Sequence, residues 1–224
     1  MGRIVKHIPN TLTCCNLVSG CLSIAFSTSG KISYAVIMIF VAAVFDFLDG
    51  FSARLLKACS PIGGELDSLS DVVSFGVAPA FIVYGMFVGV VPAFVAFLIP
   101  AMAAVRLAKF NIDTEQKTSF RGLPTPPMAI FMASLPMTAQ QFSGGWVEIV
   151  VTNEWFLLAM VVVFSLLMVT RLPFFSLKIK NLKWSNNKLR YIFIIASAVL
   201  IAIFGWLGLG LAILLYIILS LVKV

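Results

Sequence analysis

The sequence predicts an all-α, polytopic membrane protein with about eight transmembrane helices, and three observations support this fold class. Of the 224 residues, 61% are hydrophobic and only 11% are charged, and the mean hydropathy is +1.06. A soluble domain carries about a quarter charged residues, so this chain lacks the polar surface that a soluble core needs. Its apolar residues fall in runs of about 20, the helix length that spans a hydrocarbon core. The runs also lack the alternation typical of barrel strands, which leaves helices as the spanning elements.

The apolar runs follow one another along the chain and are separated by short polar connections. They cover residues 8–28, 32–56, 65–88, 92–111, 124–141, 154–170, 190–204 and 207–222. The last two runs form one apolar stretch that is too long for a single transmembrane helix. Gly205, Gly208 and Gly210 interrupt this stretch, so we expect a tight helical hairpin there.

The runs predict three parts of the chain. Residues 1–171 form a six-helix membrane domain, residues 172–189 a basic cytoplasmic loop, and residues 190–224 a C-terminal transmembrane hairpin. The first run follows two basic residues, as the apolar core of a cleaved secretory signal does. Its polar positions, among them Asn10 and Asn16, are unusual for a signal core, so we expect a retained first helix.

The distribution of basic residues accounts for the net charge of +7. With the N-terminus in the cytoplasm, all sixteen Lys and Arg residues except Lys31 fall on the cytoplasmic side, whereas Glu148 and Glu154 lie in an outer loop. The positive-inside rule predicts this asymmetry. We therefore expect a multi-pass protein of the cytoplasmic membrane, with basic loops that attract anionic lipid headgroups and no nucleic-acid partner.

The acidic residues are concentrated in the second and third runs. Five of the nine lie within 26 positions: Asp46, Asp49, Glu65, Asp67 and Asp71. The aspartates form an i,i+3 pair and an i,i+4 pair, so each pair shares one helix face. Each aspartate inside a membrane costs about 2.5–3.5 kcal/mol, and a salt-bridged helix pair would need several basic partners at the same depth. Divalent cations compensate the charge better, because hard ions bind carboxylate oxygens.

Small residues and one arginine surround these carboxylates. Gly50 and Ala53 lie beside the first aspartate pair and would let a bulky ligand approach the backbone. Gly63 and Gly64 form the turn into the third helix, and Arg54 is well placed for a phosphate oxygen. Carboxylates, two metal ions, an arginine and glycine clearance predict a site for a pyrophosphate ester, where in-line displacement would take place.

One spacing joins these residues: Asp46-x2-Asp49-Gly50-x2-Ala53-Arg54-x8-Gly63-x3-Asp67-x3-Asp71. It resembles the complete signature of the CDP-alcohol phosphotransferase family, and no position departs from that signature. The resemblance implies that Asp46, Asp49 and Asp67 ligate two divalent cations, Mg²⁺ or Mn²⁺. It also implies that Asp71 shares in this ligation and deprotonates an acceptor alcohol. The residues that it places at the CDP-lipid are Gly50, Ala53, Arg54, Ser60 and Gly63.

Two further segments resemble the membrane-integral phosphatidylserine synthases of bacteria and archaea. The first is Ile8-Pro9-Asn10-Thr11-Leu12-Thr13, with Asn16 following, and it adds Pro9, Asn10 and Thr11 to the implied CDP-lipid site. The second comprises residues 106–111 and 120–126. This resemblance implies CDP-diacylglycerol and L-serine as substrates and CMP as the product. Two helices after a six-helix core also suit this branch of the family.

A pocket for serine needs a cation for its carboxylate. Arg106, Lys109 and Arg121 lie at the cytoplasmic end of the fourth run and in the adjoining loop, on the side of the aspartates. Arginine offers the bidentate geometry that carboxylates prefer, so these residues are the predicted serine site. The alternative interpretation is that they only set the topology, because the positive-inside rule needs nothing more of them.

Several other functions remain open from the sequence. The acceptor could be glycerol phosphate or inositol phosphate, or the lipid could be an archaeal ether, as in an archaetidylserine synthase. A transporter would also use intramembrane aspartates, although such proteins often show repeats in both halves, which this chain lacks. Gly85 and Gly89 form a small-xxx-small pair that could mark a homodimer face.

Overall fold

The computed structural model describes residues 7–58, 60–112, 120–174 and 184–222. Helices make up almost all of these ranges. The elements in chain order are α1 (Ile8–Thr28), α2 (Ile32–Leu55), α3 (Pro61–Asp71), the π-helical turn η2 (Val72–Val77), α4 (Ala78–Tyr84), the 3-10 segment η3 (Ala93–Phe97), α5 (Leu98–Ile112), β1 (Phe120–Arg121), α6 (Thr125–Gln141), α7 (Trp146–Val151), α8 (Glu154–Val169), β2 (Pro173–Phe174), α9 (Trp184–Phe204) and α10 (Trp206–Val222).

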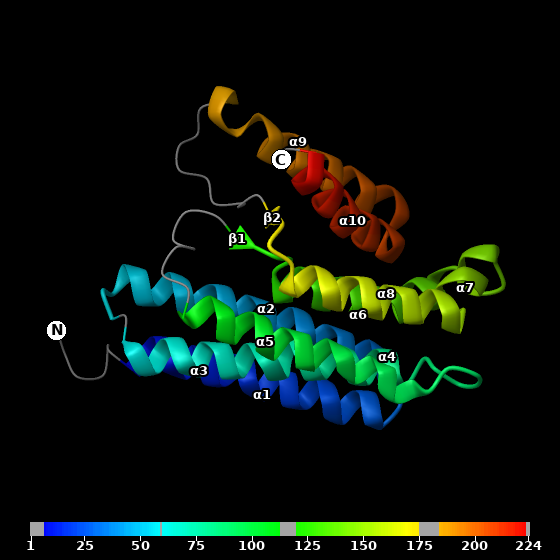
Figure 1. Ribbon diagram of the computed structural model, residues 1–224, viewed down its shortest axis with the longest axis horizontal. Coiled ribbons are helices and arrows are strands. Elements are labelled where there is room, and N and C mark those ends of the chain that lie inside the picture. Colours follow the sequence, from blue (N-terminus) through cyan, green and yellow to red (C-terminus); the bar gives the residue numbers. More distant parts are fainter. Residues whose placement is uncertain (1–6, 59, 113–119, 175–183, 223–224) are drawn as a thin grey trace.

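The helices run side by side as an antiparallel bundle, with α3, η2 and α4 following one another as a single rod (Figure 1). Within the described residues, five helical segments are long and apolar enough to cross a membrane: Ile8–Thr28, Ile32–Leu55, Pro61–Tyr84, Ala93–Ile112 and Asn187–Phe204. Two shorter apolar helices, Glu154–Val169 and Trp206–Leu221, accompany them. The predicted fold class, an all-α polytopic membrane protein, is confirmed.

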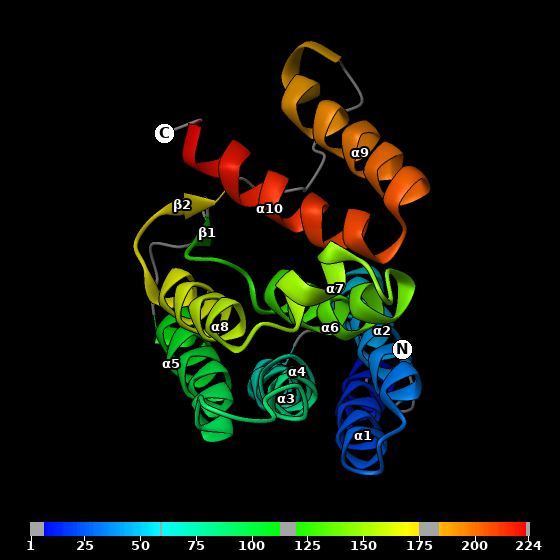
Figure 2. The same cartoon turned by 90° about the vertical axis from the view of Figure 1, so that its right-hand side faces the viewer.

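Helix α6 forms the centre of the bundle and is buried on most sides. Its Met128, Phe131 and Met132 are almost fully buried, and the Phe131 ring stacks on that of Phe164 from α8 with 4.2 Å between ring centroids. A second buried cluster joins α6 to α2 and to the rod formed by α3, η2 and α4. Helices α9 and α10 stand on one side of this bundle, where α10 contacts α6 and β2 (Figure 2).

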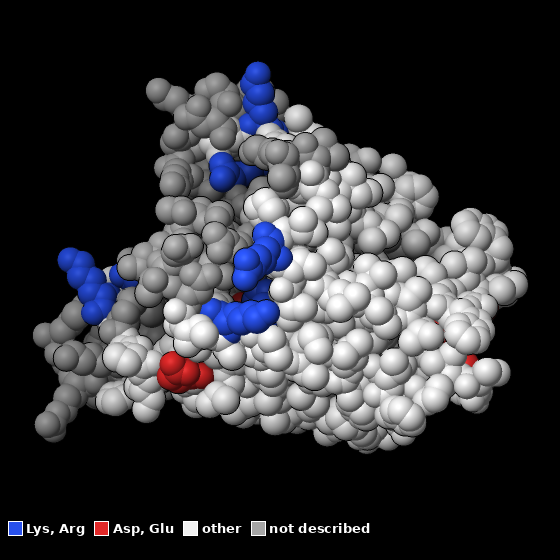
Figure 3. Space-filling view, viewed as in Figure 1, with Lys and Arg blue, Asp and Glu red and all other residues white. Residues whose placement is uncertain are grey.

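The four aspartates of the motif lie at one end of the bundle, the left-hand end in Figure 1, which we call the aspartate end; the opposite end is the far end. The last turns of α2 and α5 at this end carry Arg54 and Lys109. On the face shown in Figure 3, Lys and Arg side chains gather toward the aspartate end, whereas the described surface at the far end shows none. On this face, the described basic residues therefore follow the asymmetry predicted from the sequence.

Helix boundaries differ from the sequence prediction in three places. The third helix begins at Pro61 rather than residue 65, and α9 begins at Trp184, inside the range predicted as a loop. The C-terminal hairpin turns only at Gly205, whose φ is +57°, while Gly208 and Gly210 lie inside α10. A Cβ at Gly208 would collide with the carbonyl of Leu200, so this glycine allows α9 and α10 to approach closely rather than breaking the helix.

The glycine pair at the outer end of the third helix does not form a helix-packing face. Helix α4 ends at Tyr84, Gly85 is its C-cap, and Gly89 lies in the loop that follows. The Glu154 carboxylate organises this loop, because its Oε1 and Oε2 atoms accept hydrogen bonds from the backbone N–H groups of Val88 and Val91, each at 2.8 Å. The two glycines therefore do not share a helix face, and the homodimer stays a prediction without this motif to support it.

Candidate metal and substrate site

The connection between α2 and α3 turns the chain back on itself within a few residues. The Ala58 N–H donates to the Ala53 carbonyl at 2.9 Å, and Lys57 adopts a φ of +49°, which closes α2. Helix α3 then starts with Ser60 as N-cap, whose Oγ accepts from the Gly63 N–H at 3.1 Å, and with Pro61 in its first turn. The end of α2 and the start of α3 therefore lie side by side, and the aspartates of the two helices come close together.

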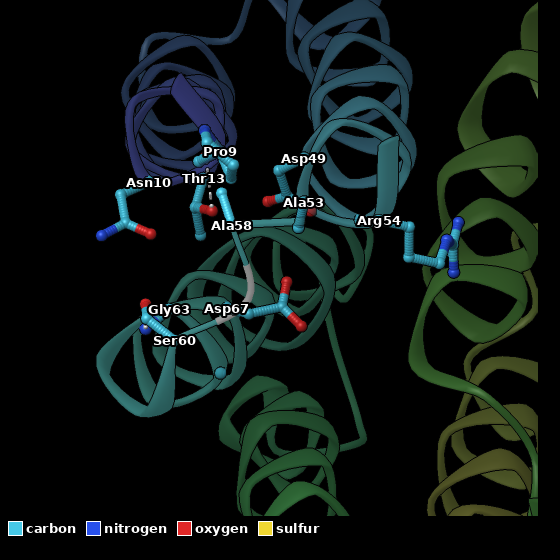
Figure 4. A pocket seen from close by; sticks show the side chains of 12 residues that line it. Pro9, Asn10, Thr13, Asp49, Ala53, Arg54, Ala58, Ser60, Gly63 and Asp67 are labelled. Atoms are coloured by element: carbon cyan, nitrogen blue, oxygen red, sulfur yellow. Dashed lines mark hydrogen bonds between the residues drawn. The ribbon is translucent and has the colours of Figure 1, made fainter. Parts of the chain in front are cut away.

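Three of the four aspartates form one cluster. Asp46, Asp49 and Asp67 each offer a carboxylate oxygen, and these oxygens lie within 4.8 Å of one another. Figure 4 shows Asp49 and Asp67 pointing toward each other from α2 and α3. Oδ2 of Asp49 and Oδ1 of Asp67 are buried without a hydrogen-bond partner among the described residues. Carboxylate oxygens that converge without donors suit a hard divalent cation, so the residues present could hold such an ion.

A cavity of about 300 Å³ opens from this cluster toward α1, and we call it the α1-side cavity. Its lining comes from α1, α2 and α3: Pro9, Asn10, Thr13, Asp49, Gly50, Ala53, Arg54, Ala58, Ser60, Gly63, Gly64 and Asp67. Two glycines leave open space in this cavity, because a Cβ at Gly50 or Gly64 would have no atom of another residue within 4 Å. At Gly63, by contrast, a Cβ would lie 3.0 Å from Asn10 Oδ1, so this glycine lets α3 approach α1.

A second cavity of about 460 Å³ opens on the other side of the aspartates, toward α5 and α6, and we call it the α5-side cavity. It shares Asp49, Gly50, Arg54, Gly64 and Asp67 with the α1-side cavity. Its own lining adds Asp46, Phe47, Ser68, Asp71, Arg106, Leu107, Phe110, Asn111, Pro124, Thr125 and Pro126. Asp49 and Asp67 of the aspartate cluster thus line both cavities.

Arg106 and Asp71 are buried charged residues that line the α5-side cavity but not the α1-side cavity. Arg106 is 8% exposed, interacts electrostatically with Asp71, and has an Nε atom that is buried without a partner among the described residues. Asp71 is also 8% exposed, and its Oδ1 accepts from Asn16 Nδ2 of α1 at 3.2 Å. At the rim, Asn111 Nδ2 donates to Ser68 Oγ at 3.0 Å. The compartment therefore offers a cation and a carboxylate side by side to a small polar molecule.

Comparison with known proteins agrees with this arrangement. Residues 6–167 match the family model described as CDP-alcohol phosphatidyltransferase. The chain belongs to this family. Members of the family use a divalent metal, and the cluster of Asp46, Asp49 and Asp67 could hold one. The family match includes α1 to α5 and ends within α8, so α9 and α10 lie beyond it.

Three relatives show what this chain is similar to. It is 35% identical to the CDP-diacylglycerol–serine O-phosphatidyltransferase of Mycobacterium leprae over 178 residues. The aligned region covers 75% of this chain and 58% of that protein. A Bacillus subtilis protein of the same name is 36% identical over 138 residues, 60% of this chain and 77% of that protein. The archaetidylserine synthase of Methanothermobacter thermautotrophicus is 36% identical over 151 residues, 65% of each. The chain thus spans about six tenths of the length of the mycobacterial relative.

Most of the residues predicted for the CDP-lipid line the α1-side cavity, but Thr11 does not. Thr11 is exposed, and its hydroxyl donates to the carbonyl of His7 at 3.0 Å. Among the predicted serine residues, Arg106 lines the α5-side cavity and Lys109 is exposed outside it. The side chain of Arg121 lies outside the described residues.

Several residues of the site were not predicted from the sequence as site residues, among them Thr13, Asn16, Gly64 and Asn111. Thr13 and Gly64 line the α1-side cavity, Asn111 lines the α5-side cavity, and Asn16 holds Asp71. The periodicity of α1 contains a signal for two of them. Thr13 and Asn16 follow Pro9 at i+4 and i+7, so all three share one helix face, whereas Thr11 at i+2 points elsewhere.

Proposed function

We propose that this chain transfers the phosphatidyl group of CDP-diacylglycerol to the hydroxyl of L-serine and releases CMP. The observation that carries the proposal is the aspartate cluster between two compartments, with Asp71 and Arg106 in the compartment away from α1. One compartment suits the cytidine diphosphate and the other suits a small acceptor with a carboxylate. The names of the bacterial relatives support the same substrates.

In this proposal, different residues of the chain bind the diphosphate and accept the proton of the serine hydroxyl. Gly50 and Gly64 leave room for the diphosphate beside the backbone, and Arg54 neutralises one of its oxygens. Asp71 accepts the proton of the serine hydroxyl, whose oxygen forms a bond to the phosphorus that bears the lipid. The bond from that phosphorus to the CMP oxygen breaks, so CMP leaves and phosphatidylserine remains in the membrane.

Two divalent ions, Mg²⁺ or Mn²⁺, would be held by Asp46, Asp49 and Asp67. Asp71 would contribute a further ligand. Ions bound there would neutralise the diphosphate and stabilise the charge on the departing CMP. Without them, several carboxylates and a diphosphate would meet in a site of low dielectric, where like charges repel strongly. The electrostatics of the site therefore require cations whenever the CDP-lipid is bound.

Arg106 is the described residue that we assign to the serine carboxylate, and Arg121 remains a second candidate from the sequence. Lys109 lies at the exposed end of α5 and remains a third, more distant candidate for the serine carboxylate. Serine and CMP are water-soluble, so the aspartate end opens to water. We place it at the cytoplasmic face of the cytoplasmic membrane.

The decisive experiment measures CMP release from CDP-diacylglycerol by the purified protein in detergent. We expect release with L-serine and almost none with glycerol 3-phosphate or inositol phosphate. A phosphorylated acceptor that outperforms serine would assign the chain to another activity of the family. No transfer to any alcohol would leave the transporter alternative, which ion-flux measurements in proteoliposomes would then address.

The archaeal relative supports one variation, an ether lipid in place of the diacylglycerol. The reacting groups are the same in both lipids, so the site described here suits either one. Parallel assays with CDP-archaeol and CDP-diacylglycerol distinguish them. Preference by tenfold or more in kcat/KM for the ether lipid would make the chain an archaetidylserine synthase.

The assignment of Arg106 predicts a defined change in acceptor binding. A bidentate charge-assisted pair contributes about 2–3 kcal/mol, and Arg106→Lys keeps the charge but loses the bidentate geometry. We expect the KM for serine to rise about tenfold or more, with the KM for CDP-diacylglycerol almost unchanged. Serinol, which lacks the carboxylate, should be a poor acceptor and lose little more in the variant. Unchanged serine kinetics would show that Arg106 does not bind the carboxylate.

A further inference from the structure

Asn16 lies on α1, and its buried side-chain amide contacts the Asp71 carboxylate. It is fully buried, and its Nδ2 donates to Asp71 Oδ1 at 3.2 Å. Its own carbonyl oxygen, Oδ1, is buried without a hydrogen-bond partner among the described residues. A buried carbonyl without a donor costs about 1–3 kcal/mol, so stability alone does not explain an amide at this position.

The surroundings of Asn16 fix α1 against the segment that carries Asp71. Ser70 Oγ donates to the backbone carbonyl of Thr13 at 3.2 Å, and Ser74 Oγ donates to the backbone carbonyl of Asn16 at 2.9 Å. These two contacts lie on either side of Asp71 in the sequence, and the backbone changes to the π-helical turn η2 directly after it. The side-chain amide of Asn16 therefore contacts Asp71 at an interface that two further hydrogen bonds hold together.

The geometry assigns Asn16 as a positioning residue for Asp71, an inference that rests on the proposed role of Asp71 in the transfer. The Asn16 amide donates to Oδ1 of Asp71, and Oδ2 of Asp71 accepts no hydrogen bond from the described residues. Oδ2 thus remains available to accept the proton of the acceptor hydroxyl in the α5-side cavity. A neutral amide can hold the carboxylate in this way without neutralising it, which a lysine or arginine would do.

Such a role should affect the chemical step and leave substrate binding unchanged. Positioned proton transfer contributes about 10²–10⁴-fold to rates, and displacement of a reacting group by about 1 Å costs up to about 10²-fold. We therefore expect Asn16→Leu, which keeps the volume but removes the donor, to lower kcat about 10- to 100-fold. The KM values for serine and for the CDP-lipid should stay within about twofold of those of the parent protein.

Ser74→Ala provides the matched control, because it removes a hydrogen bond from the same interface without touching Asp71. It should lower kcat far less than the Asn16 variants do, because the Asn16 amide still donates to Asp71. If Asn16→Leu does not fold, Asn16→Ala also removes the donor without placing a charge beside Asp71, and it should show the same loss of kcat. The inference is overturned if the Asn16 variants keep the parental kcat, if they change only a KM, or if Ser74→Ala loses kcat to the same extent.

The Asp71→Asn variant separates this inference from the proposed function. If Asp71→Asn abolishes transfer while the Asn16 variants keep full kcat, only the positioning role fails. If Asp71→Asn itself retains full activity, the proposed role of Asp71 fails and the positioning role fails with it.

Discussion

Gly50 illustrates, at the residue scale, how a missing side chain creates a binding site. It lies within α2 and lines both cavities, and a Cβ at this position would meet no atom of another residue within 4 Å. The open space beside its backbone is therefore available to a ligand. Stability does not require glycine there, because alanine is favoured over glycine in a helix interior by about 0.5–1 kcal/mol.

Gly50→Ala should therefore impair substrate binding without destabilising the fold. We expect the KM for the CDP-lipid to rise about tenfold, since filling a close-fitting site costs about 1–3 kcal/mol. The apparent Tm in detergent should stay the same or increase. Gly85→Ala is the matched control, because its Cβ would make only ordinary contacts far from the aspartates. Equal kinetics for the two variants would argue against a ligand beside Gly50.

The aspartate cluster predicts a strict dependence on divalent metal. Asp46→Asn, Asp49→Asn and Asp67→Asn each remove one charge from a site where the ions are held mainly by carboxylates, so each should reduce transfer at least about 10²-fold. EDTA should abolish the parent activity, and added Mg²⁺ or Mn²⁺ should restore it. High metal concentration can partly rescue the variants. Full activity of the parent protein in EDTA would rule out the metal site.

The sequence was sufficient to predict the aspartates but not all their neighbours. Asp46, Asp49, Asp67 and Asp71 share helix faces at i+3 and i+4, and their charge in an apolar chain makes them conspicuous. Asn16 carries no charge and lies 55 positions from its partner, so only the packing of α1 against α3 brings the two together. The periodicity of α1 places Asn16 on the same helix face as Pro9 and Thr13, but it does not identify Asp71 as the partner of Asn16.

At the scale of elements, the turn between α9 and α10 is held by a side chain from α6. Gln141 Nε2 donates to the Phe204 carbonyl at 3.1 Å, and Gln141 Oε1 accepts from the Trp206 N–H at 2.9 Å. Gly205 between them has a positive φ and lies so close to Gln141 that a Cβ would have no room. The C-terminal hairpin is thereby attached to the bundle at the far end.

Gln141→Ala should loosen this attachment. Two hydrogen bonds at an exposed site contribute about 1 kcal/mol in total, so the apparent Tm in detergent should fall by a few degrees. Gln140 is the exposed neighbour of Gln141, and Gln140→Ala provides the control that should leave the Tm unchanged. If both variants melt at the parental temperature, the hairpin is held by apolar packing alone.

The elements themselves were predicted more accurately than their ends. Runs of apolar residues of the right length predicted the spanning helices, because burial in lipid requires them. The start of the third helix depends on Ser60 and Pro61, which are polar or turn-forming residues outside the apolar run. The exact break in the hairpin depends on which of three glycines adopts a positive φ, and composition does not distinguish among them.

At the scale of the whole molecule, the aspartate cluster and the two cavities beside it lie at one end of an apolar bundle. The aspartates, both cavities that they line and the basic ends of α2 and α5 lie at the aspartate end. A lipid substrate can keep its acyl chains in the bilayer there, while its headgroup meets water-soluble reactants. The orientation of the bundle therefore decides from which side of the membrane the acceptor arrives.

We predict that the aspartate end faces the cytoplasm, because the opposite orientation would place nearly all the basic residues outside. Ser143 at the far end and Lys188 near the start of α9 are both exposed, so each can be replaced by cysteine in a variant without the native cysteines. A membrane-impermeant maleimide should label Ser143→Cys in intact cells and Lys188→Cys only after the cytoplasmic face is opened. Activity of each variant in detergent provides the control for folding. The reverse labelling pattern would place the aspartates on the outer face, and serine would then have to reach the site from outside the cell.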